Sequence, residues 1–290
     1  QNEQYLAHQT SQDYIFNALG QGAWGALFPL LTVVCSQLVG VEQAGLFSMA
    51  FVVATLLLFV AQYGVRTYQV SDLNEQRSFS DYQLQRAATV IVMVVAGLIW
   101  CVFKGYTEPM FSICTGSLLF RAVDGMADVY EGRLQQKDKL YLAGLSQALR
   151  CSASFIIFTV ILFVTRNLVW ASWGMGICAL ITLIFISAPL AILETDKSAR
   201  AKISHIKDIF VQCWPLFLAL FLYNLIDSLP KFAMEGTLSY SNQLYFNAIY
   251  FPAHTILMIS TLIYRPQLFK LASLLETSIH TPANKKRFGV

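Results

Sequence analysis

The chain has 290 residues, of which 56% are hydrophobic and 13% are charged, and its formal net charge is +3. Soluble domains carry about 25% charged residues, and the uncharged runs at 46–65 and 87–103 are too long to be hidden in one soluble core. This composition excludes a disordered chain, a disulfide scaffold, a secreted enzyme and a nucleic-acid-binding protein. It predicts an all-α, polytopic membrane protein.

A membrane-spanning helix needs about 20 mostly apolar residues. We therefore expect eight spans, at residues 14–38, 43–65, 84–104, 109–130, 141–164, 167–193, 208–234 and 243–264. Short loops alternate with longer, charged loops, which predicts helical hairpins that share one orientation. Basic residues gather in the longer loops and the tail, and only Lys104 and Arg166 lie at the short loops. The positive-inside rule then places the N-terminus, the longer loops and the tail in the cytoplasm.

The fourth span is unusually polar, but it must cross, because otherwise two basic loops would move to the outside. Arg121, Asp124, Asp128 and Glu131 follow one another at steps of three, four and three, so they share one helical face. A charge at the bilayer centre costs at least about 2.5–3.5 kcal/mol, so intramembrane charges are functional candidates. The stripe is either an internal ladder of ion pairs or the lining of a hydrated cavity for an anionic substrate or protons.

Arg150 lies about ten residues into the fifth span, near the same depth as Arg121. Two guanidinium groups at one depth are a natural docking site for phosphate oxygens. Alternatively, Arg150 neutralises Asp124 or Asp128. The sequence leaves both interpretations open.

The last two predicted spans carry a second polar group. Asn224, Asp227 and Lys231 recur at helical spacing in span seven, and His254 lies in span eight. We take Asn224 as a candidate substrate contact, and Asp227, Lys231 and His254 as candidates for coupling to a proton or cation. The simpler alternatives are an internal salt bridge and a histidine that is hydrogen-bonded to a neighbouring helix.

Polar side chains also lie near the cytoplasmic ends of the first two spans. Asn17, Gln21, Gln62 and Arg66 are either helix–helix contacts or parts of a gate. The six cysteines stand singly in apolar runs, without a CxxC pair or a Cys/His cluster, so we expect neither disulfides nor a metal site. No Gly-rich phosphate loop or HExxH motif is present, so we expect no enzymatic activity and no cofactor.

Several stretches, taken in order, resemble one family. They are GVEQAGLFSMA at 40–50, GVRTYQVSD at 64–72, RAVDGMADVYEGRLQ at 121–135, LYLAGLSQALR at 140–150, KFAM at 231–234, YFNAIYFPA at 245–253 and RPQL at 265–268. Together they resemble bacterial polysaccharide (O-antigen-type) flippases of the multidrug/oligosaccharidyl-lipid/polysaccharide exporter superfamily. The resemblance implies two six-helix lobes around a central cavity.

This resemblance also implies a function. Such flippases move undecaprenyl-diphosphate-linked oligosaccharide units across the bacterial cytoplasmic membrane for lipopolysaccharide or exopolysaccharide synthesis, by alternating access coupled to an ion gradient or membrane potential. The expected partners are the lipid-linked oligosaccharide, the bilayer, and a polysaccharide polymerase or other assembly proteins. The alternatives are drug or cation efflux on the same fold, and a non-transporting membrane subunit or remnant.

Eight spans are fewer than the twelve or more that the family implies. The expected organisation is an N-terminal six-helix lobe at 1–193, a cytoplasmic linker at 194–207, and the first two helices of an incomplete second lobe with a tail at 208–290. We therefore expect the chain to be a C-terminally truncated fragment of a longer transporter.

Overall fold

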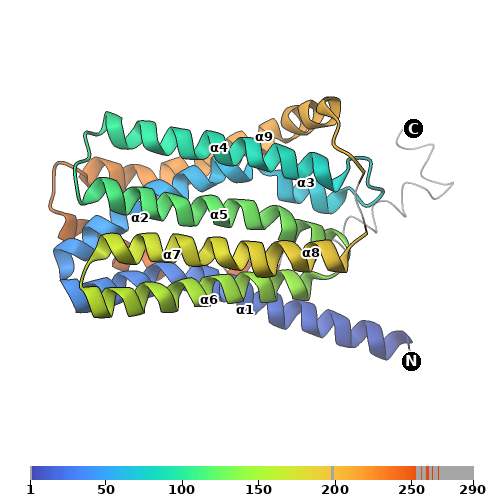
Figure 1. Ribbon diagram of the computed structural model, residues 1–290, viewed down its shortest axis with the longest axis horizontal. Helices are drawn as coiled ribbons and strands as arrows, with labels where there is room; N and C mark the ends of the chain where they lie inside the picture. Colours follow the sequence, from blue (N-terminus) through green and yellow to red (C-terminus); the bar gives the residue numbers. More distant parts are fainter. Residues whose placement is uncertain are drawn as a thin grey trace.

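The computed structural model describes residues 2–196 and 199–252, a few single residues up to 267, and side chains from Gln12 onward. These residues form an all-helical bundle, and no β-strand occurs among them (Figure 1). The helices are α1 (Asn2–Val39), α2 (Val41–Gln62), α3 (Val65–Ser71), α4 (Phe79–Phe103), α5 (Met110–Gln136), α6 (Leu140–Thr165), α7 (Leu168–Thr182), a π-helical turn (Leu183–Ser187), α8 (Ala188–Glu194) and α9 (Ile203–Met234). Residues 240–252 begin a further helix.

Six helical stretches in the described residues are long and apolar enough to cross a membrane. They are Gln12–Val39, Val41–Ser71, Phe79–Phe103, Leu140–Thr165, Leu168–Glu194 and Ile203–Met234. The polar helix α5 runs alongside them in the same bundle (Figure 1). The prediction of an all-α polytopic membrane protein is thereby confirmed. Most of the predicted eighth span lies outside the described residues.

The predicted hairpins are visible in the arrangement of the connections. The α1–α2, α4–α5 and α6–α7 turns lie together at one end of the bundle, which we call the short-loop end (Figure 1). The N-terminus and the α3–α4 and α8–α9 connections lie at the opposite end. The α8–α9 connection falls within the predicted linker at 194–207.

Helices α4, α5 and α9 extend five or six residues beyond the spans predicted at 84–104, 109–130 and 208–234. Three other predicted spans differ for reasons that hydropathy does not capture. Helix α1 starts at Asn2 instead of residue 14, because a hydropathy criterion does not register a polar helix beyond the bilayer. The span predicted at 43–65 is interrupted near its end, since Tyr63 and Gly64 adopt left-handed backbone conformations. The helix begins again at Val65 as α3. The sixth span contains the π-helical turn, which hydropathy does not reveal.

Helix α5 lies at the centre of helices α1–α8, which we call the first lobe, and it packs on α2, α4, α6 and α7. Of its 27 residues, 21 are buried, so its charges face protein and not lipid. An aromatic cluster fills the core beside it, with Phe51 and Phe120 6.1 Å apart, and Phe47 and Phe158 5.1 Å apart, between ring centroids. This arrangement explains how so polar a helix is tolerated within a membrane bundle.

Glycines allow α1 and α6 to approach closely. A Cβ atom placed on Gly144 would lie 2.2 Å from the carbonyl oxygen of Phe16, and one on Gly20 would lie 2.6 Å from the carbonyl oxygen of Gly144. The backbones of the two helices are therefore in direct contact, as is common where small residues face each other in membrane helices.

We expect Gly144→Ala to lower the free energy of unfolding by about 1–3 kcal/mol, because the added methyl group must push two backbones apart. The matched control is Gly22→Ala in α1, since a Cβ atom there meets nothing within 4 Å. That control should be neutral, or stabilising by up to about 1 kcal/mol through helix propensity. The measurement is thermal unfolding in detergent, and equal melting temperatures would contradict the packing argument.

Candidate functional site

A cavity of about 480 Å³ lies between the first lobe and α9 with the helix that follows it. Its walls come from α1, α2, α5 and α6 on one side and from α9 on the other. It brings together nine of the predicted site residues, namely Gln21, Gln62, Arg121, Asp124, Asp128, Arg150, Asn224, Asp227 and Lys231. The polar stripe of α5 therefore lines a cavity.

A network of buried charged side chains lies along α5, and Asp124 is at the centre of the part nearer to the N-terminus of that helix. Its Oδ2 accepts hydrogen bonds from Arg121 Nη1 at 3.0 Å and from Trp24 Nε1 at 2.7 Å. Its Oδ1 accepts from Arg150 Nη2 at 2.7 Å. Arg121 and Arg150 therefore share the carboxylate of Asp124. Arg150 neutralises Asp124 and also lines the cavity, so the geometry is compatible with both alternatives, charge neutralisation and anion docking.

The rest of the network continues along α5. Arg66 Nη1 lies 2.8 Å from Asp128 Oδ1 and 3.4 Å from Glu131 Oε2. Arg86 Nη2 lies 2.9 Å from Asp128 Oδ2, and Arg150 Nη1 lies 2.6 Å from Glu131 Oε1. The network therefore joins α3, α4, α5 and α6 through two carboxylates.

A charge count over this network shows a cationic surplus. It contains four guanidinium groups and three carboxylates, so its formal charge is +1. All six carboxylate oxygens lie within 3.4 Å of an arginine nitrogen. Buried charges are tolerated only when they are paired in this way. The carboxylates are consequently occupied, and within the described residues no group of three or more His, Cys, Asp or Glu could hold a metal ion.

Arg121 is held by aromatic rings as well as by charge. Its guanidinium carbon lies 4.5 Å from the ring centroid of Phe51 and 5.0 Å from that of Trp24. Its Nε donates to Thr55 Oγ1 at 3.2 Å and its Nη1 to Asp124. Among the described residues its Nη2 makes no hydrogen bond, so Arg121 retains donor capacity on the cavity wall.

The wall formed by α9 carries a second, neutral pair. Lys231 Nζ lies 3.3 Å from Asp227 Oδ2 and 5.4 Å from the ring centroid of Tyr250. Asn224 donates to the carbonyl oxygen of Leu220, as a polar residue within a helix often does. The predicted salt bridge is therefore present, and both of its members line the cavity.

Arg66 and Asn17 do not line the cavity, and Gln21 lines it while also bonding a neighbouring helix. Arg66 is part of the charge network behind the cavity wall. Asn17 is buried, and its amide nitrogen has no hydrogen-bond partner in the described part of the chain. Gln21 donates to Gln147 Oε1 at 2.8 Å across the α1–α6 interface. His254 lies outside the described residues.

Two cavity-network residues were missed from the sequence. Arg86 is fully buried and bonds Asp128, although its position beside a charged loop suggested only a topology signal. An arginine two residues inside a predicted span was the available clue. Trp24 bonds Asp124 from α1, and nothing in an uncharged apolar run distinguishes it.

Two further contacts link α2 and α4 to the part of the chain that follows α9. Lys104 Nζ lies 2.7 Å from Glu235 Oε2, just after α9. Asn247 Nδ2 donates to Ser48 Oγ at 2.7 Å. These bonds tie the end of α4 to the residue after α9, and α2 to the helix at 240–252.

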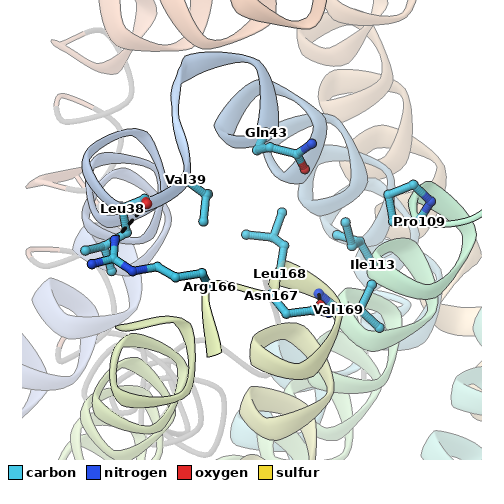
Figure 2. Close-up of a pocket in the computed structure, with 9 residues that line it drawn as sticks. All are labelled: Leu38, Val39, Gln43, Pro109, Ile113, Arg166, Asn167, Leu168 and Val169. Carbon is cyan, nitrogen blue, oxygen red and sulfur yellow. Dashed lines mark hydrogen bonds between the residues drawn. The ribbon is translucent and has the colours of Figure 1, made fainter. Parts of the chain in front are cut away.

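A second hollow of about 530 Å³ lies among the turns of the short-loop end (Figure 2). Arg166 contributes its one charged side chain, and Arg166 Nη1 already donates to the carbonyl oxygen of Leu38 at 2.8 Å (Figure 2). Asn167 Oδ1 is engaged in capping the N-terminus of α7. Because these polar groups already have partners, we place the candidate site in the central cavity.

Comparison with known proteins was made for sequence and for structure. No protein-family model and no curated protein matches this sequence. A solved chain described only as protein A superposes with a TM-score of 0.70 at 15% identity, over 91% of this chain and 65% of that one. This chain thus spans slightly less than two thirds of that protein.

Two further solved structures are MOP superfamily transporters. One, from Pyrococcus furiosus, is described as having a binding pocket of reverse polarity that suggests a different function, and it matches with a TM-score of 0.56 at 14% identity. The other is a multidrug resistance MATE family transporter in an outward-facing conformation, with a TM-score of 0.57 at 14% identity. Each match covers 91% of this chain and 63% of the transporter.

Proposed function

We propose that this chain, which shares its helical fold with MOP superfamily transporters, is part of a flippase for lipid-linked oligosaccharides. Its substrate would be an undecaprenyl-diphosphate-linked repeat unit, moved across a bacterial cytoplasmic membrane by alternating access. The sugar-diphosphate head would occupy the central cavity while the polyprenyl tail remains in the bilayer.

One observation carries this proposal: the acidic groups of the first-lobe wall are all paired, and the surplus charge is cationic. The six oxygens of Asp124, Asp128 and Glu131 already accept from arginines. Arg121 keeps a free donor on the cavity wall. Guanidinium groups bind phosphate oxygens with strong, charge-assisted hydrogen bonds. The wall is therefore suited to an anion.

The size of the cavity favours the diphosphate and the first sugar as the bound portion. A volume of about 480 Å³ lies within the range of about 300–1,000 Å³ that encloses a drug-sized ligand. A whole repeat unit would extend beyond it. Gln62 and Asn224 add uncharged donors and acceptors to the cavity wall, as recognition of hydroxyl groups requires.

Drug or cation efflux is the second candidate, and the multidrug transporter among the structural neighbours favours it. A cationic substrate needs an acidic group to receive it, whereas the cavity carboxylates here are paired with Arg or Lys. The Pyrococcus furiosus neighbour is described as differing in function by pocket polarity, so polarity is the property on which we base the choice. A non-transporting remnant is the third candidate.

The test is depletion of the source gene, followed by extraction of lipid-linked oligosaccharides and determination of their sidedness. We expect complete repeat units to accumulate on the cytoplasmic leaflet, and re-expression of the gene to restore their export. Because the native gene is used, the length of the present chain does not affect the outcome. Unchanged lipid-linked pools with normal surface polysaccharide would overturn the proposal and leave efflux as the leading candidate.

A further inference from the structure

The second span contains a break that is built from two consecutive left-handed residues. Tyr63 has φ 49° and Gly64 has φ 67°, and the helix resumes at Val65 as α3. A positive φ is uncommon for a residue other than glycine, so the tyrosine conformation must be imposed by its surroundings. The break lies beside Gln62, which lines the central cavity.

The backbone group that the break exposes has dedicated partners. In a continuous helix the carbonyl of Ala61 would accept from the amide of Val65, four residues on. Here it accepts instead from Arg86 Nη1 at 2.9 Å and from Thr89 Oγ1 at 2.7 Å, both on α4. A buried carbonyl without a partner would be costly. These two side chains therefore stabilise the broken conformation.

Arg86 also connects the break to the charge network of the cavity. Its Nη2 lies 2.9 Å from Asp128 Oδ2, while Arg66, on the far side of the break, lies 2.8 Å from Asp128 Oδ1. Arg66 shares Glu131 with Arg150, which lines the cavity. An anion that draws Arg150 away from Glu131 would change the partners of Arg66, and hence the forces across the break.

The same two residues contact α9, the first helix beyond the six-helix lobe. The ring of Tyr63 stacks on that of Phe217 with centroids 4.4 Å apart and an interplanar angle of 11°. A Cβ atom on Gly64 would lie 2.9 Å from Leu216 Cγ. A change in the backbone conformation at the break would therefore alter the packing of α9 directly.

We propose that the Tyr63–Gly64 break is a hinge that couples anion binding in the cavity to the position of α9, and that Arg86 is its positioning residue. Arg86 holds the exposed carbonyl of Ala61 and the carboxylate of Asp128 at once, so the hinge and the charge network move together. The inference rests on the proposed function, since it requires an anionic substrate in the cavity.

Cys213 provides a native reporter for this movement. It lies on α9, it is 2% exposed, and it packs in one cluster with Val65 of α3 and with Phe79 and Tyr82 of α4. The experiment uses the full chain in detergent and inorganic pyrophosphate as the probe. Pyrophosphate binding is measured by calorimetry, and alkylation of Cys213 by N-ethylmaleimide is followed by peptide mass spectrometry.

In the unsubstituted chain we expect pyrophosphate to change the alkylation rate of Cys213 by about fivefold or more, the lower end of ordinary allosteric coupling. Gly64→Ala should abolish this response while pyrophosphate still binds, because alanine disfavours φ 67° and meets Leu216. Since coupling is reciprocal, the Kd of this variant should change by no more than about the same fivefold factor. Arg86→Lys should also abolish the response, since lysine keeps the charge but cannot hold both Asp128 and Ala61. Because Arg86 belongs to the charge network, the pyrophosphate Kd of this variant is measured in parallel and only the loss of the response tests the hinge. Gly105→Ala is the matched control, with φ 66° and open space around the added methyl, and it should retain both binding and response.

The outcomes separate this inference from the function beneath it. Pyrophosphate binding without any change at Cys213, or a full response in Gly64→Ala, would overturn the hinge and leave the anion site intact. No pyrophosphate binding in the unsubstituted chain would overturn the anion site and, with it, the coupling. If Arg86→Lys does not fold, the pair Gly64→Ala and Gly105→Ala decides the question alone.

Discussion

Replacement of Arg150 by alanine is expected to destabilise the chain by about 3–5 kcal/mol, the usual cost of removing one partner from a buried ion pair. Arg150 is 1% exposed and lies 2.6 Å from Glu131 Oε1 and 2.7 Å from Asp124 Oδ1. Its loss leaves each of two buried carboxylates without one of its arginine partners. It also changes the formal charge of the network from +1 to zero. The measurement is the free energy of unfolding in detergent.

The controls separate charge from geometry. Arg150→Lys keeps the charge, but one compact ammonium cannot bridge Asp124 and Glu131 as the planar guanidinium does, so an intermediate loss is expected. Arg166→Ala removes an exposed arginine at the short-loop end, and its effect should stay within about 1 kcal/mol. If Arg150→Ala and Arg166→Ala had the same free energy of unfolding, the buried charge network would not stabilise the fold.

Most of the overall architecture could be predicted from hydropathy and from the distribution of charges. Uncharged runs of span length can only be helices in a bilayer, where every backbone group must be bonded within its own segment. The charges of the polar span that forms α5 also predicted that it faces protein or a cavity, since Arg121 and its neighbours cannot face lipid, and 21 of its 27 residues are buried. Alternating loop lengths predicted the hairpins of Figure 1.

The break between α2 and α3 could not be predicted, because its cause lies on another helix. Gly64 permits a positive φ, but glycines are frequent in membrane helices and most of them do not end a helix. Arg86 and Thr89 of α4 stabilise the break, because they donate hydrogen bonds to the carbonyl of Ala61 in place of the missing backbone amide. A local pattern carries no information about such a tertiary partner.

For the cavity, spacing predicted which residues share a face but not which residues they meet. The three- and four-residue steps placed Asp124 and Asp128 on one side of α5, where the structure has them along the cavity. One partner of Asp128 is Arg86, which no spacing rule links to it, since 42 positions separate them. The alternatives of ion-pair ladder and cavity lining were not exclusive, because the same side chains do both. Their roles in transport stay predictions.

Arg121→Ala is expected to weaken pyrophosphate binding to the full chain by roughly 10- to 150-fold, which corresponds to the loss of one charge-assisted hydrogen bond of about 1.5–3 kcal/mol. Arg121 lines the cavity, and among the described residues its Nη2 makes no hydrogen bond, so it keeps donor capacity there. Its removal should cost less stability than that of Arg150, because Asp124 would keep Arg150 and Trp24 as partners. The measurement is calorimetry with parallel thermal unfolding.

Two further variants test why Arg121 has this role. Arg121→Lys keeps the charge but loses the planar contact with Phe51 and Trp24, so an intermediate affinity is expected. Trp24→Phe keeps an aromatic ring near the guanidinium but removes the bond to Asp124, and it should leave most of the affinity. In cells, Arg121→Ala should stop export of lipid-linked oligosaccharide at normal protein levels. Wild-type pyrophosphate affinity in Arg121→Ala would show that the cavity does not use this guanidinium to receive an anion, and the charge surplus would then have a purely structural explanation.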